Sequence, residues 1–90
     1  MIAPLTDLEG RRVLITGASS GLGAQFARDM AGAGAAVALC ARRTSRLTSL
    51  KAEIEKAGGR AHAIEMDVDN EGSVIRAFDA AEAVFGEIDG

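Results

Sequence analysis

Three glycines lie at fixed spacing in the segment Thr16-Gly17-Ala18-Ser19-Ser20-Gly21-Leu22-Gly23. The segment follows a short apolar run and precedes residues with helical periodicity. Gly17 would let the chain turn off a strand, Gly21 would let the backbone approach a ligand, and Gly23 would let a helix pack closely on a sheet. Unpaired N–H groups at the start of such a helix attract phosphate oxygens. The segment therefore predicts a turn that holds the phosphates of a dinucleotide.

This glycine segment has two other interpretations. It could be a turn that only connects a strand to a helix, with the hydroxyls of Ser19 and Ser20 serving as caps rather than as ligand contacts. A mononucleotide P-loop would require Lys-Ser or Lys-Thr after the last glycine, whereas Ala24 and Gln25 follow Gly23. The position between a buried strand and an amphipathic helix favours dinucleotide binding.

The residues after the second apolar run predict which dinucleotide is bound. Folds that prefer NAD place an acid there to bond the ribose hydroxyls, and folds that prefer NADP offer Arg. Ala41 occupies this position, Arg42 and Arg43 follow it, and no acid lies between Asp29 and Glu53. The pattern favours NADP over NAD, unless the arginines are ordinary surface charges. An adenosyl-methionine methyltransferase also has a glycine loop, but it usually presents an acid where Ala41 stands.

Apolar periodicity alternates between short runs and helical stretches along the chain. The three predicted strands are 12–16, 36–41 and 61–66. The predicted apolar helix faces are Leu22, Phe26, Met30 and Ala33; then Leu47, Leu50, Ile54 and Ala57; then Val74, Ala77, Phe78, Ala81 and Phe85. Asp69 or Asn70 would cap the third helix and Gly86 would end it.

This β-α-β-α-β-α order predicts an α/β fold, a Rossmann-like three-layer sandwich whose parallel sheet has the strand order 3-2-1. We expect residues 1–90 to be a partial NAD(P)-binding domain, truncated before the fourth strand. The strand at 13–15 would then keep an open apolar edge, so the isolated chain should be marginally stable or self-associating. A half-domain completed by a partner chain is the alternative.

Composition excludes several classes of function. The net charge is −3 and the basic residues are scattered, which argues against a nucleic-acid partner; Arg42, Arg43 and Arg46 suit one phosphate group better than a duplex. The longest apolar run is too short to span a membrane, and the N-terminus lacks the pattern of a signal peptide, so we expect a cytoplasmic protein. Cys40 is the only cysteine and is expected to be buried, and the lone His62 suggests no metal site.

The Thr-Gly-x-x-x-Gly-x-Gly spacing resembles the first turn of the short-chain dehydrogenase/reductase family. The likeness continues through 8–11 (Leu-Glu-Gly-Arg), 34–37 (Gly-Ala-Ala-Val) and 66–68 (Met-Asp-Val), and so covers nearly the whole chain. It implies an oxidoreductase that moves hydride between the nicotinamide and a carbonyl or alcohol substrate, with a homo-oligomer as the usual assembly.

The resemblance also implies residue roles. Asp67 would bond the adenine amino group and Val68 would contribute its backbone. The family's catalytic Ser, Tyr and Lys would lie beyond Gly90, so no catalytic residue is assigned here and the chain alone is expected to be inactive. A non-catalytic nucleotide-binding or assembly module is the alternative function. The candidate cofactor-binding residues are Gly17, Ser19, Ser20, Gly21, Leu22, Gly23, Arg42, Arg43, Asp67 and Val68.

Overall fold

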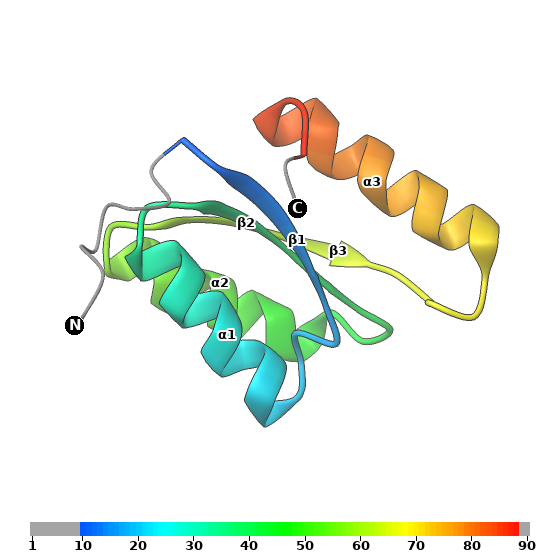
Figure 1. The fold of residues 1–90 in the computed structure, drawn as a ribbon. Coiled ribbons are helices and arrows are strands. Elements are labelled where there is room, and N and C mark those ends of the chain that lie inside the picture. The colour runs from blue at the N-terminus through cyan, green and yellow to red at the C-terminus, as the bar shows by residue number, and fades with distance from the viewer. Residues whose placement is uncertain (1–9, 89–90) are drawn as a thin grey trace.

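The computed structural model of the chain describes residues 10–88, which form three strands and three helices in strict alternation (Figure 1). The elements are β1 (Arg12–Thr16), α1 (Gly21–Gly32), β2 (Ala36–Ala41), α2 (Ser45–Lys56), β3 (Arg60–Glu65) and α3 (Glu71–Phe85). The predicted bounds of the first two strands are confirmed, and β3 begins and ends one residue earlier than predicted.

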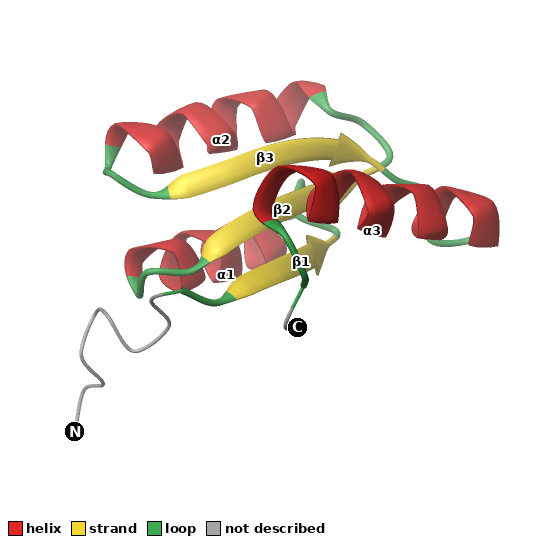
Figure 2. Ribbon diagram, turned by 90° about the horizontal axis from the view of Figure 1, so that it is seen from above, coloured by secondary structure: helices red, strands yellow, loops and turns green. Residues whose placement is uncertain are grey.

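All strand pairs are parallel, and the sheet order β1-β2-β3 confirms the predicted order 3-2-1. Val13 of β1 is aligned with Val37 of β2, which is aligned with Ala61 of β3. Helices α1 and α2 lie on one face of the sheet and α3 lies on the other (Figure 2). The three-layer, Rossmann-like arrangement is thus present. Because the strands are parallel, their carboxyl ends meet at one edge of the sheet.

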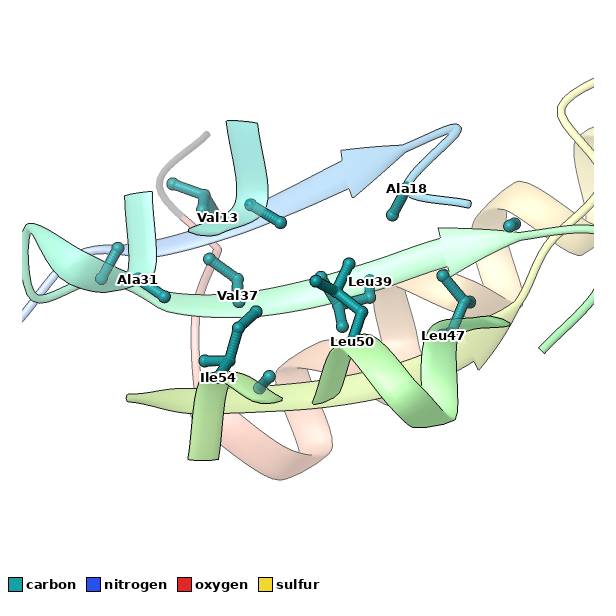
Figure 3. Close-up of a cluster of buried hydrophobic side chains, with 12 residues drawn as sticks. Val13, Ala18, Ala31, Val37, Leu39, Leu47, Leu50 and Ile54 are labelled. Carbon is teal, nitrogen blue, oxygen red and sulfur yellow. The ribbon is translucent and has the colours of Figure 1, made fainter. Parts of the chain in front are cut away.

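The larger core lies between the sheet and the helices α1 and α2 (Figure 3). Val37 and Leu39 of β2 are fully buried there and pack with Leu47, Leu50 and Ile54 of α2. These three residues confirm the predicted inner face of α2, whereas Ala57 ends that helix as an exposed residue. An ion pair and hydrogen bonds between Arg28 of α1 and Glu53 of α2 join the outer surfaces of the two helices.

The smaller core lies under α3. Buried residues from β2, β3 and α3 form it: Ala38, Cys40, Ile64, Met66, Ala77 and Ala81. Arg12 of β1 donates from Nη1 to the carbonyl oxygen of Phe85 at 3.4 Å, which links the first strand to the end of the last helix. The chain leaves α3 through Gly86, whose φ of 94° is in the region that favours glycine.

The predicted inner face of α1 is wrong at Leu22 and Phe26, although Met30 of the same predicted face does pack against the larger core. Leu22 and Phe26 are 83% and 58% exposed, while Ala27 and Ala31 are buried against the sheet. The helix carries a second apolar stripe of small residues, and close approach to the sheet selects that stripe because alanine needs little space. In α3 the predicted inner face is confirmed at Ala77 and Ala81, which are buried, and Val74 and Phe85 pack against the smaller core. Phe78, which was predicted in the same face, is 40% exposed.

Candidate functional site

The glycine turn joins β1 to α1 through a backbone that only glycine adopts easily. Gly17 has a φ of 64°, in the left-handed region. The N–H of Ala18 then donates to the carbonyl oxygen of Cys40 at 3.1 Å, which fixes the turn to the carboxyl end of β2. At Gly23, a Cβ would lie 2.2 Å from the carbonyl oxygen of Gly17. The first turn of α1 therefore lies directly against the backbone of the turn at Gly17, where no side chain would fit.

Ser20 is the N-cap of α1. Its Oγ accepts a hydrogen bond from the N–H of Gly23 at 3.1 Å and donates to the carbonyl oxygen of Gly17 at 2.9 Å. The capping role left open by the sequence is thus present for Ser20. The N–H groups of Gly21 and Leu22 begin the helix and have no acceptor within it, because the helical acceptor of each would lie four residues earlier. They are the groups that an α-helix offers to phosphate.

The carboxyl end of β2 places two exposed arginines beside this turn. Ala41 is buried, and its carbonyl oxygen accepts from the N–H of Met66 at 2.9 Å, so β2 and β3 stay paired up to the point where Arg42 begins. Arg42 and Arg43 are exposed. Helix α2 starts at Ser45, and its N-cap residue Thr44 makes no side-chain capping hydrogen bond. Cationic groups and a helix N-terminus thus lie at the same place, and both attract anions.

The loop after β3 holds Asp67 by several hydrogen bonds. The N–H of Asp67 donates to Oγ of Ser73 at 2.9 Å, and Oδ1 of Asp67 accepts from the N–H of Asp69 at 3.0 Å. Asn70 caps α3, with its Oδ1 accepting from the N–H of Ser73 at 3.0 Å. Of the two predicted capping residues, Asn70 is the correct one, so the Asp67 carboxylate is not used as a helix cap.

Arg42 and Asp67 form an ion pair across the ends of β2 and β3. Nε of Arg42 lies 3.7 Å from Oδ1 of Asp67, and their side chains are 72% and 39% exposed. From the sequence, the two residues are expected to be separate contacts for a ligand. The structure shows that they contact each other.

A cleft of about 510 Å³ runs along the carboxyl ends of the three strands, and we call it the strand-end cleft. Its size is in the range of small-molecule sites. It is lined by Gly17, Ser19, Cys40, Ala41, Arg42, Arg43, Ser45, Arg46, Met66 and Val68. The predicted residues Gly17, Ser19, Arg42, Arg43 and Val68 thus line one cleft. Ser20, Gly21, Leu22, Gly23 and Asp67 are not part of its lining.

Ser45 and Met66 line the cleft but were missed as site residues, and Arg46 was considered only as part of a basic cluster. Met66 is 2% exposed and was interpreted as the last residue of a strand. Cys40 was correctly expected to be buried. Burial raises the pKa of its thiol to about 11, so the thiol stays protonated at neutral pH and is a poor nucleophile.

Residues 11–90 match the family model described as short chain dehydrogenase. The chain belongs to the short-chain dehydrogenase/reductase family. An uncharacterized oxidoreductase of Mycobacterium tuberculosis is 45% identical over 87 residues, which are 94% of this chain and 34% of that protein. The chain therefore spans about a third of the length of this relative.

Solved structures of the family superpose closely on this fold. A short-chain type dehydrogenase/reductase from Mycobacterium marinum is 42% identical, with a TM-score of 0.89 over 94% of this chain and 34% of that one. A metagenomic short-chain oxidoreductase in complex with NADP is 34% identical, with a TM-score of 0.85 over 91% of this chain and 37% of that one. The resemblance noted in the sequence is thus confirmed, and nicotinamide cofactors are those the family uses.

Two classes of site are not found in the part of the chain that the structure describes. No helix in residues 10–88 is both long and apolar enough to cross a membrane. Among the same residues, no group of three or more His, Cys, Asp or Glu side chains could hold a metal ion.

Proposed function

We propose that residues 1–90 are the NADP-binding part of an oxidoreductase, and that the strand-end cleft holds the adenosine end of the cofactor. When bound, NADPH would supply a hydride to a carbonyl carbon, and its oxidised form would accept one from an alcohol carbon. The residues of this chain bind and orient it: Gly21 and Leu22 offer N–H groups to the pyrophosphate, and Ser19 offers a hydroxyl. Asp67 and Val68 would contact the adenine, as the family resemblance implies.

The observation that carries this proposal is the pair Arg42 and Arg43 next to the buried Ala41. Both arginines line the cleft, and no carboxylate follows β2 directly. A ribose 2′-phosphate would meet guanidinium groups, whereas the 2′-hydroxyl of NAD would find no acceptor at Ala41. The relative that was solved in complex with NADP supports this assignment.

Calorimetric titration with NADP and NAD tests the cofactor preference. A charged hydrogen bond contributes about 1.5–3 kcal/mol, so Arg42→Ala should weaken NADP binding about ten- to a hundredfold and leave NAD binding nearly unchanged. Ala41→Asp should shift the preference toward NAD, because a carboxylate accepts from ribose hydroxyls and repels the phosphate. High salt should weaken NADP binding more than NAD binding.

Arg60→Ala is the matched control. It removes the same charge from the first residue of β3, at the amino-terminal ends of the strands and away from the cleft at their carboxyl ends. It should leave the ratio of the two dissociation constants unchanged. Equal binding of NADP and NAD by the wild type, or equal weakening of both by Arg42→Ala, would contradict the assignment.

These 90 residues are not expected to catalyse hydride transfer by themselves. The sequence contains no tyrosine, the residue that exchanges the proton in the family, so we propose that these 90 residues bind NADPH without turning it over. The alternative is a cytoplasmic binding or assembly module that is non-catalytic at any length. NADPH oxidation with a carbonyl substrate by a longer chain that contains a Tyr-x-x-x-Lys pair would support the enzyme. Turnover by the 90 residues alone, abolished by a substitution within them, would contradict the inactivity.

A further inference from the structure

We infer that Asp67 determines cofactor specificity by opposing the binding of the 2′-phosphate, since its carboxylate already pairs with the guanidinium that the phosphate needs. The inference rests on the proposed function, and it assigns Asp67 a role besides contact with adenine. The observation behind it is the ion pair in which Nε of Arg42, a residue of the strand-end cleft, lies 3.7 Å from Oδ1 of Asp67.

The two side chains of this ion pair differ in how firmly the surrounding structure holds them. Asp67 is half-buried and is held in the β3–α3 loop, since its N–H donates to Ser73 and its Oδ1 accepts from the N–H of Asp69. The side chain of Arg42 is 72% exposed, and Asp67 is its ion-pair partner among the described residues. The carboxylate therefore stays in place, and Arg42 is the group that must move when a competing anion arrives.

A 2′-phosphate and the Asp67 carboxylate compete for one guanidinium. If Arg42 turns to the phosphate, the ion pair is lost; if it is shared, the phosphate lies near a fixed negative charge and is repelled. NAD carries no 2′-phosphate and encounters neither effect. The Asp67 charge therefore lowers NADP affinity relative to NAD affinity, while Arg42 and Arg43 raise it.

The expected size of the effect follows from the exposure of the pair. An exposed ion pair contributes only a small free energy. A contribution of that size changes an equilibrium constant, such as the dissociation constant of a cofactor, by at most about fivefold. Asp67→Asn should therefore strengthen NADP binding relative to NAD binding about two- to fivefold. The amide oxygen of Asn can still accept from the N–H of Asp69, so the loop should keep its conformation, which circular dichroism and thermal unfolding would check.

The experiment compares the ratio of NADP to NAD dissociation constants in a double-mutant cycle. The wild type, Asp67→Asn, Arg42→Ala and the double variant are titrated by calorimetry with both cofactors. Loss of the adenine contact would weaken both cofactors alike and cancel in the ratio. The ratio should shift toward NADP on Asp67→Asn, and this shift should be smaller in the Arg42→Ala background, because competition for the guanidinium is lost there and only the repulsion between the carboxylate and the phosphate remains. Asp69→Asn is the matched control, because it removes the same charge two residues away from an exposed position.

Several outcomes would overturn the inference. They are an unchanged ratio, a shift toward NAD, an equal shift with and without Arg42, or an equal shift in Asp69→Asn. If the wild type shows no NADP preference and Arg42→Ala has no selective effect, the proposed function fails and this inference fails with it. If the NADP preference stands and depends on Arg42 but does not respond to Asp67→Asn, only the inference is wrong.

Discussion

Gly23, in the first turn of α1, lies against the backbone of Gly17 at the end of β1, so that a Cβ on Gly23 would stand 2.2 Å from the Gly17 carbonyl oxygen. Gly21, two residues earlier, would place a Cβ in open space, with no atom within 4 Å. The fold itself therefore requires glycine at position 23. It does not require glycine at position 21, so the role of Gly21 in binding can be tested separately.

Gly23→Ala should destabilise the chain, because the new methyl group meets backbone that cannot move alone. Overpacking of this kind costs about 1–3 kcal/mol, and each kcal/mol lowers Tm by roughly 4–8 °C in a chain of this size. Gly21→Ala should keep Tm within a few degrees but weaken NADP binding, since its methyl group projects where the pyrophosphate is proposed to approach. Thermal unfolding and calorimetry measure the two effects. Equal losses of Tm in both variants would contradict this division.

The two serines of the turn should also separate. Ser20→Ala removes the N-cap of α1, whose Oγ bonds both Gly23 and Gly17, and should cost about 1 kcal/mol of stability. Ser19→Ala should leave the free energy of unfolding nearly unchanged and weaken cofactor binding, because Ser19 lines the strand-end cleft. Urea unfolding of both variants, with NADP titration, tests this. A stability loss in Ser19→Ala as large as that in Ser20→Ala would show that the capping assignment is wrong.

Cys40 should make the stability of the chain sensitive to alkaline pH. Burial raises the pKa of its thiol from 9.0 to about 11, whereas the thiol of the unfolded chain ionises near its ordinary pKa. The folded state thus binds a proton that the unfolded state loses, and the resulting stability is full below pH 9 and declines as the pH rises toward 11. Cys40→Ala removes this contribution, so its free energy of unfolding should fall less steeply between these pH values. Parallel slopes for the two proteins would contradict the prediction.

The strands and the glycine turn could be predicted from sequence because their signals are local. The short apolar run at 12–16 defines a strand that ends at Gly17. The helical pattern of the second helix ends at the glycines at 58 and 59. Neither boundary requires any knowledge of packing. The site residues predicted at the strand ends followed from topology, since parallel strands bring their carboxyl ends together.

The remaining features depend on side chains that meet only in the fold. The ion pair between Arg42 and Asp67 joins residues far apart in sequence, and no periodicity reveals it. Met66 was predicted only as the last residue of a strand, and the structure shows that it is buried and also lines the cleft. Leu22 and Phe26 were wrongly assigned to the inner face of α1, because hydrophobicity alone cannot tell a stripe of large residues from a stripe of alanines. The distance between helix and sheet decides between them.

Substitutions at two adjacent residues of α1 should therefore differ in their effect on stability. Phe26 is 58% exposed and Ala27 is fully buried against the sheet. Phe26→Gln should change the free energy of unfolding by no more than about 0.5 kcal/mol, as is usual for exposed positions. Ala27→Leu should lower it by about 1–3 kcal/mol, because the larger side chain must push the helix from the strands. A helix that buried its large stripe would give the reverse order.

Self-association provides a second measurement on Phe26→Gln. Leu22 and Phe26 lie one helical turn apart and are both exposed, and apolar surface of this kind promotes association in water. In sedimentation velocity at several concentrations, Phe26→Gln should therefore reduce association of the chain relative to the wild type. Gln25→Ala is the matched control, since it changes an exposed polar residue beside Phe26 and should leave association unchanged. If Phe26→Gln associates as strongly as the wild type, this surface does not drive self-association, and the open edge of β1 is the next candidate to test. A wild type that is monomeric at every concentration would contradict self-association itself.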